Sequence, residues 1–233
     1  MSNQTSKGTL ELEAVRQYHQ ATKHHVHRFA PGPGYLNWDT QPDPFRRYGG
    51  APLVGLDKIP PTGEPRYDEV FIEGRHSPVL LNRRSISQLF FDSLAISAWK
   101  SASGSRWALR VNPSSGNLHP TEGYLLCGPV DGLCAGPVVC HYAPKEHALE
   151  VRAKVGLELW QTLCQQCPPE TIFVGFTSVH WREAWKYGQR AYRYCQHDLG
   201  HAIAAVAIAA AGLGWQTRLM DDLGTAELAR LLG

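Results

Sequence analysis

The sequence lacks a signal peptide, a membrane-spanning segment and a dense set of cysteines. Its first residues, MSNQTSKGTLELEAV, contain no apolar core of a signal peptide. The longest weakly polar run, residues 202–215, is too short and too rich in alanine to span a bilayer. Six cysteines in 233 residues form no dense disulfide framework. We therefore expect a reduced, cytoplasmic protein that makes no membrane contact.

The sequence also has little excess charge. Its 23 Lys and Arg residues nearly balance its 21 Asp and Glu residues, for a formal net charge of +2. This balance gives no reason to expect nucleic acid as a partner. The chain contains no internal repeat, no low-complexity tract and no G-x-G-x-x-G segment, so a Rossmann nicotinamide domain is not expected. Its content of 43% hydrophobic and 19% charged residues is typical of a globular protein.

Proline and glycine divide the chain into three predicted parts. Residues 1–29 have a helix-like pattern that turns basic and rich in histidine. Residues 30–68 carry most of the prolines, which predicts an extended wrapping arm outside the core. The aromatic residues of this arm indicate that it lies against a surface. Residues 69–233 are expected to form the main domain.

The main domain shows the periodicities of both helices and strands. A helix is predicted to begin near Ser85, with Gln88 reaching back to cap it and apolar residues recurring at helical spacing as far as Ala98. The other predicted elements are a strand at 122–128, a hairpin turning at 144–146, a helix at 156–166, a buried strand at 171–179, and helices within 185–213 and at 225–232. This mixture predicts an α+β fold with helices on a sheet.

Two adjacent arginines form the first candidate site. Arg83 and Arg84 stand immediately before the hydroxyl of Ser85, at the predicted start of a helix. Guanidinium groups make charge-assisted bonds to phosphate, and a helix N-terminus adds oriented N–H donors. The segment is therefore a candidate phosphate site. The alternative, which the segment taken alone favours, is an ordinary solvated helix end whose capping groups satisfy one another.

The loop RVNPSSGNLHP, residues 110–120, forms the second candidate site. Its glycine and two prolines exclude a helix or a central strand. Ser114, Ser115 and Asn117 suit the edge of a planar heterocycle that carries carbonyls and ring nitrogens. The alternative is a turn whose polar side chains bond to its own backbone.

Together, and in this order with one helix between them, the two segments resemble the FMN-dependent nitroreductase family. Longer stretches resemble its SagB-type dehydrogenase branch, which includes McbC-like azoline dehydrogenases: EAVRQYHQATKHH, RVNPSSGNLHPTEGYLL, EAWKYGQRAYRYCQHDLGHA and AAAGLGWQTRLMDD. The resemblance runs from about residue 11 to the C-terminus. It implies a mixed, mainly antiparallel sheet flanked by helices, with FMN as cofactor. It also implies that FMN is bound by Arg83, Arg84, Ser85, Ser114, Ser115 and Asn117.

Lys186 and Tyr187 are the candidate catalytic pair. A lysine near other positive charges, or a tyrosine beside a lysine, can act as acid or base near neutral pH. The local pattern alone favours an amphipathic helix with snorkelling cations and buried rings. The resemblance implies that the pair removes a proton from a small-molecule or peptide substrate while hydride passes to the flavin. The sequence therefore predicts an FMN-dependent oxidoreductase.

A rival hypothesis concerns metal. His197 and His201 lie four residues apart, as in zinc proteases, but an aspartate replaces the general-base glutamate and no third ligand is apparent. A structural histidine pair is the more common arrangement, so a zinc hydrolase is only a remote alternative. Cys164 and Cys167 form a lone CxxC before two prolines, typical of a helix end. The histidines at 24, 25 and 27 are most simply a solvated turn, and no metal site is expected.

The resemblance also carries an expectation about assembly. The family commonly continues beyond the equivalent of residue 233, so the domain at 69–233 is expected to lack a C-terminal strand. The family binds flavin at a dimer interface, which implies a homodimer or a pairing with a second nitroreductase-like domain. A non-catalytic, flavin-binding half-domain that needs a partner is the alternative function.

Overall fold

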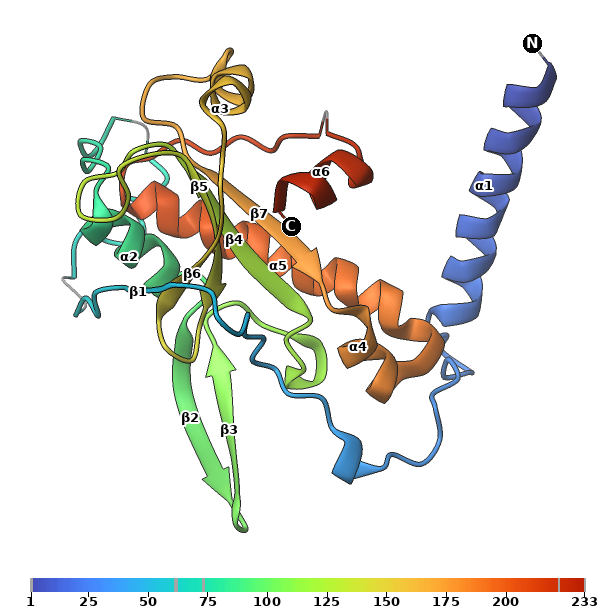
Figure 1. The fold of residues 1–233 in the computed structure, drawn as a ribbon. Coiled ribbons are helices and arrows are strands. Elements are labelled where there is room, and N and C mark those ends of the chain that lie inside the picture. Colours follow the sequence, from blue (N-terminus) through green and yellow to red (C-terminus); the bar gives the residue numbers. More distant parts are fainter. Residues whose placement is uncertain (1, 61–62, 73, 222, 233) are drawn as a thin grey trace.

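A computed structural model of the chain describes residues 2–60, 63–72, 74–221 and 223–232. A five-stranded sheet in the order β1-β6-β5-β4-β7 forms its centre, and every neighbouring pair in it is antiparallel. A separate hairpin, β2–β3, projects from one end of the molecule (Figure 1). The strands are β1 (Leu53–Gly55), β2 (Ile96–Ala102), β3 (Ser105–Arg110), β4 (Thr121–Cys127), β5 (Val138–Ala143), β6 (Ala148–Lys154) and β7 (Phe173–Ser178).

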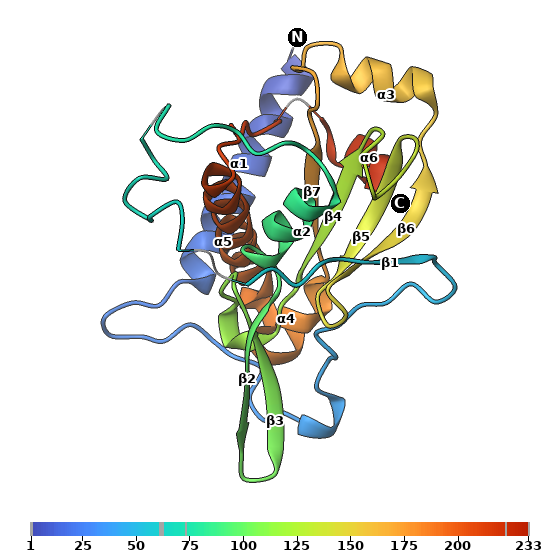
Figure 2. The same ribbon diagram turned by 90° about the vertical axis from the view of Figure 1, so that its left-hand side faces the viewer.

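Helices cover both faces of the sheet, which confirms the predicted α+β class. Helices α2 and α5 pack on one face and α6 on the other, while α1 extends away from the sheet (Figures 1 and 2). The helices are α1 (Ser2–Thr22), α2 (Arg83–Phe91), α3 (Leu157–Cys164), α4 (His180–Tyr187), α5 (Ala191–Gly212) and α6 (Thr225–Leu232). Among the described residues, no helix is both long and apolar enough to cross a bilayer.

Strand β4 lies at the centre of the core, and all seven of its residues are buried. Leu125 and Cys127 pack with α2 and α5, whereas Tyr124 and Leu126 pack with α6. This division follows from the alternation of side chains along a strand. The predicted strand at 122–128 and the hairpin at 144–146 are both confirmed.

The N-cap of α2 lies three residues before the predicted one. Asn82, not Ser85, is the N-cap: its side chain accepts a hydrogen bond from Ser85 N at 3.0 Å, and Ser85 Oγ accepts one from Asn82 N at 2.9 Å. Gln88 donates to Asp92 instead of reaching back. Asparagine is among the best N-cap residues, and a serine at the N3 position completes the reciprocal pair.

Two further expectations about elements were wrong. Ala98 lies in β2 and not in a helix, because α2 ends at Phe91. The chain turns between β2 and β3 at Ser103 and Gly104, both with positive φ, which is the backbone of a tight hairpin turn. Strand β7 is half-buried, not fully buried, since it lies at the sheet edge with β4 as its one neighbouring strand.

Residues 47 and 48 of the arm contact the domain. Tyr48 and Tyr124 hydroxyls are 2.7 Å apart, and Arg47 forms ion pairs with Glu146 and Glu150 at 2.6 and 2.7 Å. Contrary to the expectation that it stays outside the core elements, the arm also supplies β1, which pairs with β6 at the sheet edge.

Candidate functional site

The loop at 110–120 is fixed by one buried carboxylate from α5. Asp198 accepts hydrogen bonds from Ser114 Oγ at 2.6 Å, from Ser115 Oγ at 3.0 Å and from Ser115 N at 3.0 Å. Asn117 donates to Ala108 O at 2.9 Å. The side-chain donors that the sequence suggested for a ligand are therefore engaged within the protein, as the alternative interpretation of a self-bonded turn describes.

Gly116 brings this loop against Lys186 and Tyr187. A Cβ atom at position 116 would lie 2.6 Å from the Tyr187 hydroxyl and 3.0 Å from Lys186 Nζ. The polar ends of these two α4 side chains therefore lie directly over the bare glycine backbone. Two of the segments that the sequence singled out thus meet at one place in the fold.

Helix α4 is held in place by a buried ion pair. The Arg182 guanidinium donates to Glu122 on β4 and, at 2.7 Å, to His119 O at the end of the loop. Glu122 in turn contacts His141 on β5 at 2.8 Å, and His141 contacts Glu150 on β6 at 2.7 Å. This chain of contacts anchors α4, and with it Lys186 and Tyr187, to three neighbouring strands.

Burial changes the ionisation of groups beside the pair. It raises the pKa of Glu183 to about 8, and the charge of Asp198 acts in the same direction. It also raises the pKa of Tyr187, with Glu183 adding to the effect and Arg190 opposing it. Burial, with Arg110 and Arg182 nearby, lowers the pKa of His119 to about 3, so that this imidazole stays neutral. The candidate site is therefore rich in groups that resist carrying charge.

Arg83, Arg84 and Ser85 lie elsewhere, at the N-terminus of α2. Arg83 N donates to Asp131 O at 2.9 Å, and its guanidinium is 3.4 Å from Asp57. The Arg84 side chain is exposed. Ser85 is buried, and its hydroxyl is used within the cap of α2. The two arginines are thus available to solvent, whereas the Ser85 hydroxyl is not.

The two predicted halves of the site lie at opposite ends of β4. The loop at 110–120 leads into this strand, and the loop that contacts Arg83 N leaves it. Seven residues of extended chain separate them by about 20 Å. Within one chain, the structure brings together Gly116, Lys186 and Tyr187, and it keeps Arg83 and Arg84 apart from them.

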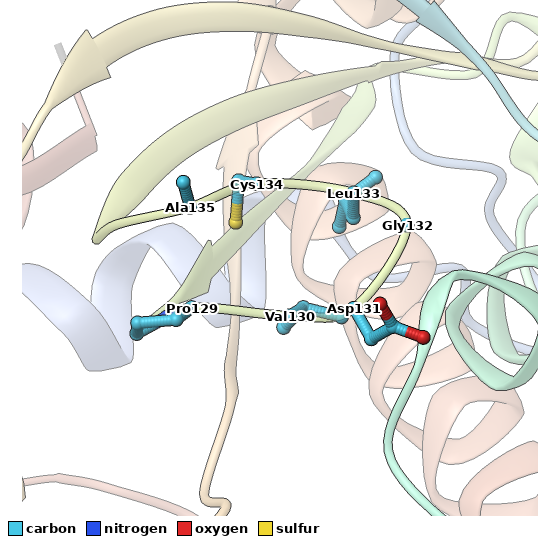
Figure 3. Close-up of a pocket in the computed structure, with 7 residues that line it drawn as sticks. All are labelled: Pro129, Val130, Asp131, Gly132, Leu133, Cys134 and Ala135. Carbon is cyan, nitrogen blue, oxygen red and sulfur yellow. The ribbon is translucent and has the colours of Figure 1, made fainter.

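A surface hollow of about 510 Å³ lies beyond the C-terminal end of β4 and is lined by residues 129–135 (Figure 3). Its one ionisable oxygen-bearing side chain is Asp131, whose carboxylate would repel phosphate. A second hollow of about 460 Å³ includes Cys164, Cys167 and Trp160. Neither hollow contains Lys186 or Tyr187, so neither defines the candidate site.

The metal alternative gains no support from the arrangement. His197 and His201 are exposed on α5, while Asp198 between them points to the loop and is buried. In the ranges that the structure covers, no group of three or more His, Cys, Asp or Glu residues could hold a metal ion. His24 accepts a hydrogen bond from Ala30 N at 3.0 Å, a local structural role.

Sequence reasoning missed Asp198 and Glu183. Asp198 lies within the His197–His201 pattern, where it was considered only as the aspartate that replaces the general-base glutamate of zinc proteases. Glu183 precedes Lys186 by three residues and Tyr187 by four, which places all three on one side of a helix. That spacing was a usable signal, but it gains meaning only once burial is known.

No protein-family model and no curated protein matches the chain. Solved structures do. A protein of Anabaena variabilis assigned as a nitroreductase matches with TM-score 0.62 and 26% identity, over 84% of this chain and 38% of that one. A Ralstonia eutropha protein assigned likewise matches with TM-score 0.55 and 14% identity, over 77% and 81%. A chain of the E. coli microcin synthetase McbBCD complex, solved with truncated pro-MccB17, matches with TM-score 0.54 and 18% identity, over 97% and 85%.

These similarities define the class of the fold. The antiparallel sheet, with α2 and α5 on one face, is a nitroreductase-like α+β fold. The chain spans 38% of the Anabaena variabilis protein, so that protein is much longer than the matched region.

Proposed function

We propose that the chain is an FMN-dependent oxidoreductase of the SagB-type dehydrogenase kind, with Lys186 and Tyr187 exchanging the substrate proton. The observation that carries this proposal is the position of Lys186 Nζ and the Tyr187 hydroxyl over Gly116. The nitroreductase-like fold supports a flavin as the group that they serve. FMN, when bound, would supply a two-electron acceptor for hydride, which no amino-acid side chain provides.

The residues present fit such a cofactor in two places. At Gly116, Lys186 Nζ and the Tyr187 hydroxyl occupy the space that a Cβ atom would need. Both groups can donate hydrogen bonds, which suits the carbonyls and ring nitrogens of a flavin edge. At the start of α2, the accessible guanidinium of Arg84 and the partly exposed one of Arg83 suit a phosphate group. Ser114, Ser115 and Asn117 would contribute by fixing the loop and through atoms that their internal bonds leave free.

The chain's own residues can handle the proton. Tyr187 is half-buried beside Tyr194, with ring centroids 4.2 Å apart, and Arg190 lies over both rings. Lys186 Nζ and the Tyr187 hydroxyl can therefore pass a proton between a substrate at Gly116 and solvent. The substrate class that we propose is a small molecule or a peptide.

The separation of the half-sites supports assembly from two chains. A C2 dimer can place α2 of one chain next to the Gly116 loop of the other, and so complete two equivalent sites. We propose a homodimer, or a pairing with a second nitroreductase-like domain. One of the similar structures is a chain of the McbBCD complex, solved with truncated pro-MccB17 bound. The alternative, a flavin-binding half that is inactive without a partner domain, has the same requirement for a second chain.

The first experiment measures flavin retention. The purified protein is mixed with FMN, passed through gel filtration and examined by visible absorption. Replacing Arg83 and Arg84 together by alanine should weaken FMN binding about a hundredfold or more, because each charge-assisted phosphate contact contributes roughly 1.5–3 kcal/mol. Replacing the exposed Arg66 and Arg75 together is the matched control and should leave binding unchanged.

Equal retention by both double variants would remove the arginine pair from the phosphate site. No retention by the wild-type protein alone, followed by retention after a partner domain is added, would favour the half-domain alternative.

A further inference from the structure

Glu183 is a completely buried acid without a partner. Its exposed fraction is zero, and neither carboxyl oxygen has a hydrogen-bond partner among the described residues. The charged form of such a group is strongly disfavoured, because neither water nor a hydrogen bond stabilises it. Burial therefore keeps the Glu183 side chain protonated and uncharged at neutral pH.

Titratable groups surround Glu183 from two helices. Lys186 and Tyr187 follow it by one turn on α4, at the spacing at which side chains become neighbours. Asp198 and Cys195 face it from α5. Asp198 is the carboxylate that anchors Ser114 and Ser115. Glu183 thus lies between the anchor of the loop and the pair over Gly116.

We propose that Glu183 is a positioning residue that sets the ionisation of Tyr187 and the charge balance around Lys186. As a neutral acid it offers Lys186 no opposite charge, and as a carboxylate it opposes formation of a tyrosinate at Tyr187. Its effect on turnover rests on the proposed function. The electrostatic coupling itself involves only residues of this chain and needs no flavin.

The direction of the coupling follows from the neighbouring charges. Burial and the charge of Asp198 raise the pKa of Glu183 to about 8, while Lys186 lowers it. Above that pH Glu183 carries a negative charge, and a second negative charge on the adjacent Tyr187 becomes less favourable. Burial and then Glu183 raise the pKa of Tyr187, and Arg190 acts in the opposite direction. Burial raises the pKa of Cys195 to about 11, so this thiol is still protonated when Glu183 ionises.

The coupling has a consequence for the proton that the site exchanges. When Glu183 loses its O–H proton to solvent, its carboxylate disfavours a second negative charge on Tyr187, whose hydroxyl then releases its proton less readily. Proton exchange at the pair should therefore decline as Glu183 ionises. The only bond that changes at Glu183 is its own O–H bond, so the carboxyl acts through Lys186 and Tyr187 and not on a substrate.

The test is a tyrosinate absorbance titration of the flavin-free protein. Subtracting the titration of Tyr187→Phe isolates the signal of Tyr187. In Glu183→Gln, which is neutral at every pH, Tyr187 should ionise at a lower pH than in the wild type. In Glu183→Asp, which keeps the charge, the midpoint should move back toward the wild-type value. Glu158→Gln, an exposed glutamate on α3, is the control and should change nothing. An identical Tyr187 midpoint in wild type and Glu183→Gln would overturn the proposal.

A second measurement keeps the proposal falsifiable if Glu183→Gln fails to fold. Carbon-13 NMR of the wild-type protein with labelled glutamate should show one carboxyl that is still protonated at pH 6.5. Complete ionisation of all glutamates at that pH would contradict the proposal.

Turnover separates this inference from the proposed function. If the wild type retains FMN and oxidises a substrate, Glu183→Gln should lose the decline in kcat above about pH 8, while Glu183→Asp should keep it. If the protein never retains FMN, the proposed function fails, yet the Tyr187 titration still decides whether Glu183 controls its neighbour.

Discussion

Position 116 shows how a residue without a side chain can define a site. Gly116 has φ of 62°, in the left-handed region, and the polar ends of Lys186 and Tyr187 occupy the space that a Cβ would need. Both facts favour glycine, one through backbone conformation and one through packing.

Replacing Gly116 by alanine should therefore have two costs. The left-handed conformation costs roughly 1 kcal/mol for an L-residue, and the new methyl group must displace Lys186 and Tyr187. We expect a loss of about 1–3 kcal/mol in the free energy of unfolding, measured by urea denaturation.

Gly104→Ala is the matched control for this variant. Gly104 also has positive φ, at 81°, but a Cβ there would meet no atom within 4 Å. It should show the conformational cost alone. Equal losses in the two variants would mean that contact with Lys186 and Tyr187 does not constrain position 116.

Residue-level reasoning can select candidate segments where the chemistry is local. The arginines at 83 and 84 and the loop at 114–117 could be singled out because their residue types are unusual at those spacings. Asp198 and Glu183 could not be assigned a role from sequence, because their importance lies in being buried and in facing another element. Burial of a single helical residue depends on tertiary packing that its neighbours in sequence do not encode.

Among the elements, the three central strands share a buried ionic network. Glu122 on β4, His141 on β5 and Glu150 on β6 are fully buried, and the network continues to Arg182 on α4 and Arg47 on the arm. Burial raises the pKa of both carboxyls, but contacts with His141 and the arginines more than reverse this, so that both pKa values lie below the usual range.

This network predicts how stability depends on pH. Carboxyls with depressed pKa values stabilise the fold fully above their unfolded pKa of about 4.3, and this contribution is lost as pH falls through the folded values. Stability should therefore decline below about pH 4. Glu122→Gln should lose roughly 3 kcal/mol at pH 7, because it leaves Arg182 and His141 without their carboxylate. It should also show a weaker decline in acid, followed by urea denaturation at several pH values.

Glu69→Gln serves as the comparison, since Glu69 pairs with Arg75 at an exposed position and should matter little. If Glu122→Gln were as stable as the wild type, the network would not hold the strands together.

Element-level prediction erred at boundaries. Strands β4 to β7 and most helices could be predicted because their apolar patterns are long, whereas the three-residue β1 could not. The start of α2 was misplaced because Asn82, Ser85 and Gln88 offer two overlapping capping patterns, and the asparagine prevails. The β2–β3 hairpin was not predicted, because its exposed strands lack a regular alternation of apolar residues and its Ser-Gly turn is a weak signal.

For the whole molecule, the separation of the half-sites along β4 predicts complementation between chains. Arg83→Ala/Arg84→Ala removes the proposed phosphate end of the site, and Gly116→Leu fills its proposed ring end. Each variant alone should retain little FMN. An equimolar mixture, refolded together, should retain about one quarter of the wild-type amount, because half of the random dimers are mixed and each has one intact site. Retained flavin after gel filtration is the measurement.

A mixture that retains no more FMN than its components would show that both halves must come from the same chain. Co-refolding of two wild-type samples controls for losses during the procedure.

The pairing of β1 with β6 has a consequence for the order in which the molecule forms. Leu53 meets Glu150 from about a hundred residues away along the chain, whereas β4, β5 and β6 meet through short connections. Closing so long a loop has a high entropic cost, which slows the formation of contacts between distant segments. We therefore expect the hairpin strands to assemble before the arm docks. Since Arg47 and β1 lie on that arm, its docking both brings a positive charge to the buried Glu150 and completes the sheet edge.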